Sequence, residues 1–152
     1  MPALYKVDCR DEALLCDVFY AEKPDAVIHF AGYKSVGESV KKPLLYYDNN
    51  VGATVGVLKA MQRSGVNKII FSSSATVYKW SETMPLTEEH ELLPYNPYGM
   101  TKYISEQLLK AQCEADNELT AISLRYFNPV GAHPSGIIGE DQGEKPANLM
   151  PY

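Results

Sequence analysis

A tyrosine and a lysine stand four residues apart in the segment NPYGMTK, and a run of serines, FSSSATVY, precedes them. Side chains four apart on a helix lie on one face, so Tyr98 and Lys102 can reach a single ligand. A tyrosine is a weak base because its ordinary pKa is about 10, but a nearby ammonium group favours its phenolate. The Ser74 hydroxyl can relay a proton between a substrate alcohol and that phenolate. These residues predict proton removal from an alcohol while a cofactor accepts a hydride.

The tyrosine–lysine spacing is a weak signal by itself, because the chain has 11 tyrosines and chance matches are expected. The alternative interpretation is a half-exposed tyrosine beside a solvated lysine, with the serines forming a polar turn. The order of the segments favours the catalytic interpretation. A strand with a serine-rich end, a polar loop and the start of a helix follow one another in the chain.

The elements that would position these residues alternate between strands and helices. Short apolar segments predict strands over 25–30, 67–74 and 119–127, and residues 3–8 are predicted to end an earlier strand. Apolar periodicity, a proline start and a glycine stop predict helices over 11–23, 43–64 and 97–117. The segment between the first strand and the second helix, AGYKSVG, is interpreted as a loop. Such alternation favours an α/β fold, a parallel sheet covered by helices on both faces, with ligands bound beyond the carboxyl ends of its strands.

Composition limits the remaining function classes. A length of 152 residues predicts one core, and a net charge of −5 without a basic block argues against a nucleic-acid partner. The sequence contains neither a secretory signal nor an apolar run approaching the roughly 20 residues that span a bilayer, so a cytoplasmic location without membrane contact is predicted. Cys9, Cys16 and Cys113 are expected to be reduced packed thiols, and no metal site is predicted. His29 is expected to be a structural residue of the first strand.

Five segments in order resemble the UDP-galactose 4-epimerases of the extended short-chain dehydrogenase/reductase family: VIHFAGYKSVGESVKKPLLYYDNNV, FSSSATVY, NPYGMTK, LRYFNPVGAHPSG and GED…NLMPY. The resemblance implies a Rossmann-type, doubly wound parallel sheet that binds NAD, and a smaller carboxyl-terminal domain that closes over the UDP-sugar. It also implies interconversion of UDP-galactose and UDP-glucose. A tyrosine phenolate takes the proton of the sugar 4-hydroxyl, NAD⁺ takes the hydride of carbon 4, and the hydride returns to the other face of the 4-keto sugar.

The resemblance assigns roles to individual positions of this sequence. The base falls on Tyr98, its partner lysine on Lys102 and the proton-relaying serine on Ser74. The implied cofactor-side positions are Asp8, Phe30, Ala31, Gly32, Lys34, Asn49, Tyr98, Lys102, Tyr126 and Phe127. The implied substrate-side positions are Lys34, Ser74, Tyr98, Asn128, Asn148 and Leu149.

The sequence also departs from the family pattern. No glycine precedes Gly32, so the glycine-rich turn that holds the cofactor pyrophosphate in the family is not in this sequence. The resemblance therefore implies a partial NAD-binding domain over 1–130 and an irregular segment over 131–152 that leads toward a substrate domain. We expect the chain alone to bind NAD poorly and to lack epimerase activity. Lys79 stands where the family commonly has glycine.

Alternative functions stay open at this stage. Related sugar-nucleotide 4,6-dehydratases and decarboxylases share the tyrosine–lysine helix, but they need a carboxyl group where this chain has Ala75 and Thr76. The residues therefore favour epimerisation over elimination. A non-catalytic protein that keeps this segment as a partner-binding module is the other alternative. In the family, helices resembling 43–64 and 97–117 pair in a homodimer.

Overall fold

The computed structural model describes residues 3–131 and 133–137 of the chain. Within this part, three parallel strands form one sheet in the order β1-β2-β3. The strands are β1 (Val27–His29), β2 (Lys68–Ser74) and β3 (Thr120–Tyr126). The helices are α1 (Glu12–Glu22), α2 (Val36–Lys41), α3 (Pro43–Tyr46), α4 (Gly52–Ser64) and α5 (Pro97–Ala115), with a π-helical turn η1 (Tyr47–Val51) and a 3₁₀ turn η2 (Ala75–Val77). The predicted strands and long helices are confirmed with ends shifted by a few residues.

Local residue choices explain where the helices begin and end. Asn96 caps α5 by accepting a hydrogen bond from the Gly99 amide, and Pro97 supplies a first helical residue that needs no amide donor. Asp11 caps α1 in the same way through the Leu14 amide. Gly65 ends α4 with a left-handed backbone (φ 74°), which a residue without a Cβ adopts at little cost.

Two predicted features differ from the structure. Part of the segment interpreted as a loop forms the short helix α2, because the Ser35 side chain accepts the Glu38 amide and caps a helical turn. Residues 3–8 pair with none of the three strands in the described part of the chain. The backbone that follows them instead contacts α4 closely, since a Cβ added to Gly56 would lie 2.2 Å from the Cys9 carbonyl oxygen.

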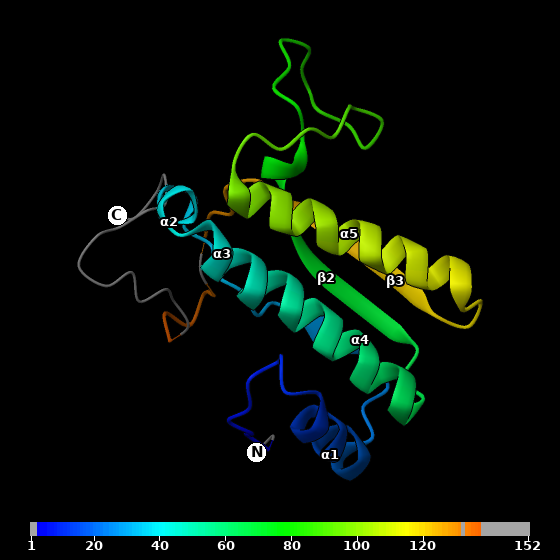
Figure 1. Ribbon diagram of the computed structural model, residues 1–152. Coiled ribbons are helices and arrows are strands. Elements are labelled where there is room, and N and C mark those ends of the chain that lie inside the picture. The colour runs from blue at the N-terminus through cyan, green and yellow to red at the C-terminus, as the bar shows by residue number, and fades with distance from the viewer. Residues whose placement is uncertain (1–2, 132, 138–152) are drawn as a thin grey trace.

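The core lies between one face of the sheet and the helices α4 and α5 (Figure 1). Ile69 and Phe71 of β2 meet Val57 and Met61 of α4 and Leu109 of α5, all of them buried. On the opposite face of the sheet, apolar side chains remain 37% to 63% exposed: Ile28, Phe30, Ile122, Leu124 and Tyr126. In the described residues helices thus cover one sheet face, which matches part of a Rossmann-type α/β fold. None of the described helices is long and apolar enough to span a membrane.

The amino terminus of α5 packs against η2 at very short range. A Cβ added to Gly99 would lie 2.6 Å from the Thr76 carbonyl oxygen and 3.2 Å from the Thr76 hydroxyl oxygen. Only glycine permits this approach, because a real Cβ essentially never comes within 3.0 Å of such an atom. The contact sets the position of Tyr98, the neighbouring residue, relative to the serine-rich end of β2.

We expect Gly99→Ala to lower the free energy of unfolding by about 1–3 kcal/mol, because the methyl group forces α5 away from η2. Urea denaturation followed by circular dichroism measures this change. Gly37→Ala is the matched control, since a Cβ at Gly37 meets nothing within 4 Å and alanine favours the helical conformation of α2. Equal stabilities of the two variants would contradict the steric argument.

Candidate active site

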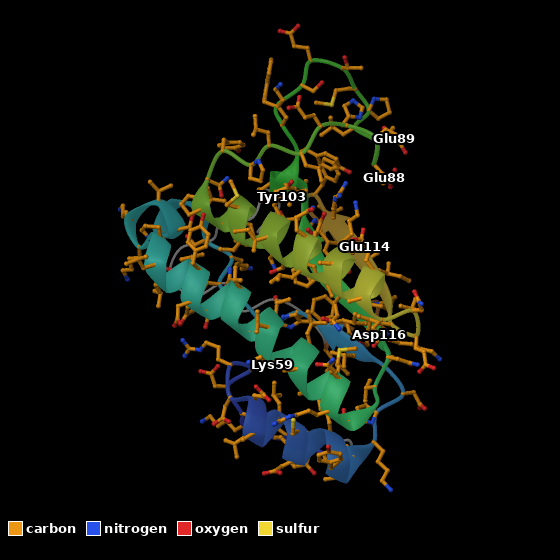
Figure 2. All side chains as sticks on the ribbon, turned by 45° about the vertical axis from the view of Figure 1, so that its right-hand side comes forward. Lys59, Glu88, Glu89, Tyr103, Glu114 and Asp116 are labelled. Atoms are coloured by element: carbon orange, nitrogen blue, oxygen red, sulfur yellow. The ribbon has the colours of Figure 1, made fainter. Side chains whose placement is uncertain are left out.

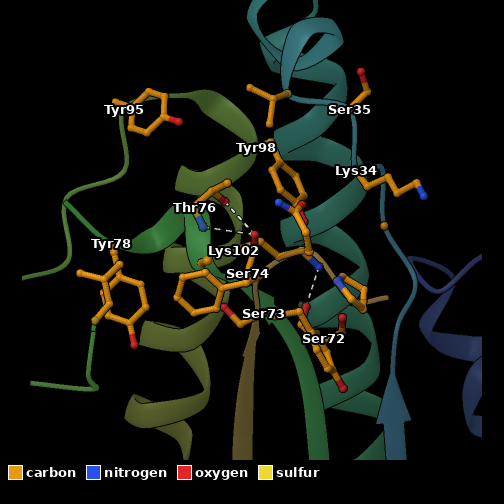
Figure 3. A pocket seen from close by; sticks show the side chains of 18 of the residues that line it. Lys34, Ser35, Ser72, Ser73, Ser74, Thr76, Tyr78, Tyr95, Tyr98 and Lys102 are labelled. Carbon is orange, nitrogen blue, oxygen red and sulfur yellow. Dashed lines mark hydrogen bonds between the residues drawn. The ribbon is translucent and has the colours of Figure 1, made fainter. Parts of the chain in front are cut away.

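A cavity of about 1120 Å³ opens at the carboxyl ends of the three strands (Figure 3). Its lining comes from the residues that follow β1, the end of β2 with η2, the residues that end and follow β3, the loop 79–95, and the first turns of α5. Parallel α/β sheets bind their ligands at this edge. The cavity therefore lies where the sequence predicts a ligand site.

Tyr98, Lys102 and Ser74 lie together at this cavity and are all buried. The Lys102 ammonium donates a hydrogen bond of 2.7 Å to the Ser72 carbonyl oxygen, and its nitrogen lies 5.9 Å from the centroid of the Tyr98 ring. The Ser74 hydroxyl oxygen accepts hydrogen bonds from the amide and the hydroxyl of Thr76, at 3.2 Å and 3.0 Å. Figure 3 shows the Ser74 oxygen between Thr76 and Tyr98. The structure thus brings together the three residues predicted to carry the chemistry.

Burial raises the pKa of Tyr98, while a hydrogen bond from Ser74 and the positive charge of Lys34 act in the opposite direction. From the sequence, Lys102 was expected to supply this charge. In the structure the Lys102 ammonium is held by a backbone carbonyl group, and Lys34, from the segment after β1, supplies the charge that favours the Tyr98 phenolate.

Burial also lowers the pKa of Lys102 to about 8, because the ammonium form loses most of its hydration. This pKa lies closer to neutral pH than that of an exposed lysine, so Lys102 loses its proton more readily. His29, the buried last residue of β1, has a pKa lowered to about 4 by burial and by the charge of Lys102. Its Nε2 atom lies 3.4 Å from the Thr54 hydroxyl oxygen, and the structural role expected for it stays a prediction.

Asn50 is a site residue that the sequence argument missed. Its side chain accepts the Tyr33 amide at 2.8 Å, donates to the Tyr33 carbonyl at 3.0 Å and donates to the Thr101 hydroxyl at 3.1 Å. Thr101 in turn donates to the Tyr98 carbonyl oxygen at 2.7 Å. Asn50 thereby joins the turn after β1 to the helix that carries Tyr98. Asn50 lies in a π-helical turn, a feature that is frequent at functional sites. The sequence shows no pattern for such a turn, so only the structure identifies this residue.

The other predicted site residues are distributed more widely. Phe30, Gly32, Lys34, Tyr126, Phe127 and Asn128 line the cavity. Asn49 donates a hydrogen bond to the Asn50 side chain, beside the cavity rather than in its lining. Ala31 likewise lies between two lining residues without lining the cavity itself. Asn148 and Leu149 lie outside the described residues.

Asp8 is not among the cavity residues. The Arg10 side chain donates to both of its carboxylate oxygens, at 3.1 Å and 2.7 Å, and the Arg10 amide donates to one of them at 2.9 Å. These hydrogen bonds lower the pKa of Asp8 to about 2. Arg10 also pairs with Asp48 of η1, so the predicted adenine-side acid is anchored near the start of α4.

Charge is unevenly distributed around the cavity. Three lysines line it, Lys34, Lys79 and Lys102, and its described lining contains neither aspartate nor glutamate. Acidic side chains lie elsewhere, for example Glu88 and Glu89 on the projecting loop and Glu114 near the end of α5 (Figure 2). Because the chain as a whole carries a net charge of −5, this local excess of lysine favours an anionic ligand.

Three comparisons with known proteins agree with this geometry. The family model described as "NAD dependent epimerase/dehydratase family" matches residues 2–152. The chain is 54% identical over 150 residues to UDP-glucose 4-epimerase 4 of Oryza sativa subsp. japonica, covering 99% of this chain and 41% of the relative. It is also 54% identical over 148 residues to the UDP-glucose 4-epimerase of Bacillus subtilis, covering 97% and 44%. The chain thus spans less than half the length of these relatives.

Solved structures give the same result. The UDP-glucose 4-epimerase of Bifidobacterium longum in complex with NAD⁺ and UDP matches with a TM-score of 0.86 and 54% identity, over 90% of this chain and 41% of its own. The enzyme of Stenotrophomonas maltophila, with bound NAD and formylated UDP-arabinopyranose, matches with a TM-score of 0.95 and 45% identity, over 99% and 45%. The partial Rossmann-type arrangement is therefore confirmed.

We expect replacement of Asn50 by alanine to lower the free energy of unfolding by about 1–3 kcal/mol, because the buried Thr101 hydroxyl and the Tyr33 backbone groups lose their partner. Chemical denaturation measures this difference. Asn67→Ala serves as control, since Asn67 contributes a backbone carbonyl, bonded to the Thr120 amide, rather than its side chain. A loss of the same size in both variants would show that the side-chain hydrogen bonds of Asn50 do not contribute to the free energy of unfolding.

The lowered pKa of Lys102 predicts a pH-dependent stability difference. Below about pH 8 the folded protein must hold a buried ammonium, whereas the unfolded chain keeps the ordinary value of 10.5, so stability rises as the pH increases between these values. We expect Lys102→Met to unfold with about 3 kcal/mol more free energy than the parent at pH 7, and with a much smaller excess at pH 10. Urea denaturation of both proteins at the two pH values measures this; an excess independent of pH would contradict the assignment.

Proposed function

The chain belongs to the NAD dependent epimerase/dehydratase family, and on this premise we propose that it carries the catalytic segment of an NAD-dependent epimerase that interconverts UDP-glucose and UDP-galactose. The observation that carries the proposal is the convergence of Tyr98, Ser74 and Lys102 on one cavity. The relatives above 50% identity that cover nearly the whole chain bear the name UDP-glucose 4-epimerase, which supports the same substrate class.

The described part of the cavity suits a dinucleotide and a UDP-sugar. Lysines in the lining complement phosphate groups, and the exposed rings of Phe30 and Phe127 offer flat apolar surfaces for a planar ring. NAD, when bound, supplies a reversible acceptor for the hydride of sugar carbon 4. The residues of this chain would then bind the ligands and move the proton.

The proton steps follow from the geometry of the three residues. Tyr98 Oη, as phenolate, takes the proton of the sugar 4-hydroxyl, with the Ser74 hydroxyl between them as a relay. The hydrogen bond from Ser74 and the charge of Lys34 stabilise the phenolate against its unfavourable burial, while Lys102, held at the Ser72 carbonyl, lies beside the ring. After the 4-keto sugar turns over, the same tyrosine returns the proton to the sugar 4-oxygen, and carbon 4, reduced on its other face, takes the opposite configuration. One base on one side of the cavity suffices because the sugar, rather than the enzyme, reorients.

Elimination chemistry is less well supported by this cavity. A 4,6-dehydratase must protonate a leaving hydroxyl group and needs a carboxylic acid near carbon 6. Ala75 and Thr76 occupy the positions where such acids would stand, and the described lining contains no carboxyl group at all. We therefore propose epimerisation as the reaction.

The assembly and location complete the proposal. We place the protein in the cytoplasm as a homodimer that pairs through α4 and α5. The exposed side chains of Leu44 and Leu45, on α3, which η1 joins to α4, support an apolar contact on this side of the molecule.

The function is testable in a chimera in which this chain replaces the matching 148-residue segment of the Bacillus subtilis UDP-glucose 4-epimerase. We expect the chimera to convert UDP-galactose to UDP-glucose, and Tyr98→Phe to lower its kcat by roughly 100-fold or more through loss of the base. Proton NMR of the sugar products measures the rate and identifies the product.

Tyr20→Phe is the matched control, because the Tyr20 hydroxyl lies on α1 and donates to the backbone carbonyl of Arg63. It is expected to leave kcat unchanged. A folded chimera that releases a 4-keto-6-deoxy sugar, or that leaves UDP-galactose unchanged while the parent enzyme converts it, would overturn the proposal.

A further inference from the structure

We propose that the largely buried ion pair between Glu106 and Arg125 is a positioning element that holds three walls of the cavity at fixed distances from the helix that carries Tyr98. This inference rests on the proposed function for its catalytic consequence. Its geometric content stands independently of that function. Neither residue was among the predicted site residues, and neither lines the cavity.

Glu106 lies on the same stripe of α5 as Tyr98 and Lys102, because the three residues follow at intervals of four. It is 7% exposed and receives a two-pronged contact from Arg125 of β3. The Arg125 Nε atom donates to Oε1 at 3.0 Å, and Nη2 donates to Oε2 at 2.8 Å. Two parallel hydrogen bonds fix the orientation of both side chains, which a single contact does not.

The pair binds two further segments. The Ser73 hydroxyl donates to Oε1 of Glu106, which ties the end of β2 to α5. The remaining Arg125 nitrogen, Nη1, donates to the Tyr78 hydroxyl at 3.1 Å, and the guanidinium carbon lies 5.0 Å from the centroid of the Tyr78 ring. Tyr78 in turn stacks on Phe127, with 6.4 Å between the ring centroids. One carboxylate therefore connects α5 with β2, β3 and the residue after η2.

Each connected residue stands next to a residue of the cavity or belongs to its lining. Ser73 and Tyr78 themselves line the cavity, and Arg125 precedes the lining residues Tyr126 and Phe127 in the chain. A displacement of about 1 Å at such a site costs as much as a hundredfold in rate. The ion pair thus fixes the relay hydroxyl and the aromatic wall relative to the Tyr98 phenol.

The location of the pair explains why charged rather than apolar side chains occupy these positions. Glu106 and Arg125 line a second cavity of about 570 Å³ between α5 and β3, so water reaches them from the side away from the active site. An apolar pair would fill the space, but it would form neither the fork nor the hydrogen bonds to Ser73 and Tyr78. Buried ion pairs contribute little net stability compared with apolar replacements, whereas their directional bonds specify geometry.

The test uses four variants in the chimera described above: E106Q, R125K, the double variant E106L/R125M and the control E12Q. E106Q and R125K are expected to lower kcat by roughly 10- to 100-fold, with KM for UDP-galactose within about threefold of the parent, because the walls shift while the binding groups remain. R125K is informative because it keeps the charge and loses the fork. E106L/R125M is expected to regain the melting temperature of the parent but not its kcat.

The control removes a surface ion pair of the same kind, since Glu12 contacts Lys59 and Arg63 on the side of α1 and α4. E12Q should change neither parameter. A merely structural role would make kcat recover together with the melting temperature in E106L/R125M, and this outcome would overturn the inference. Parental activity in R125K would overturn it as well.

Hydrogen–deuterium exchange separates this inference from the proposed function. Peptides covering residues 72–76 and 125–128 are expected to exchange roughly tenfold faster in E106L/R125M than in the parent or E12Q, whether or not the chimera converts UDP-galactose. An inactive parent with this exchange pattern would refute the proposed function and support the positioning role. Unchanged exchange in these peptides would refute the positioning role even in an active enzyme.

Discussion

The whole site depends on the contact between the start of α5 and η2, where the absence of a side chain at Gly99 lets the helix approach the Thr76 carbonyl. From this point one buried stripe of α5 crosses the sheet. It begins with Tyr98 and Lys102 at the cavity and ends with Leu109 in the apolar core. A single rigid helix therefore holds both the chemistry and a large part of the packing. A shift that relieves strain at one end must move the other.

Like α5, the strands change from apolar to polar buried residues along their length. On the covered face, β2 runs from Ile69 and Phe71 in the core to Ser73 at the cavity, and β1 ends at the buried His29. Each buried polar group without a partner would cost about 1–3 kcal/mol, so the polar end of the sheet requires a connected hydrogen-bond network. Asn50 and Glu106 are the centres of two such groups of hydrogen bonds. The apolar end offsets the cost of ordering these groups.

The sequence predicted those features that depend on short stretches of residues. A proline start and a glycine stop indicated the helical segment 43–64, strand composition indicated β2 and β3, and the family resemblance assigned the reactive trio. The missed features depend on distant residues. The hydrogen bonds of Asn50 reach Tyr33 and Thr101, and the partners of Glu106 come from β2 and β3, so no local pattern encodes them. Helix α2 was missed because the glycines around it favour a loop and its single Ser35 cap is a weak local signal.

The charge interactions of the site also depend on residues that folding brings together rather than on one short sequence motif. Burial disfavours the charged form of both Tyr98 and Lys102, so their spacing on α5 does not by itself produce a phenolate–ammonium pair. The Lys102 ammonium is held at the Ser72 carbonyl, and the opposing influences on Tyr98 come from Ser74 of β2 and Lys34 after β1. The proton affinity of Tyr98 is therefore a property of three segments held in register. For this reason the residues that hold those segments together matter to the chemistry as much as the tyrosine itself.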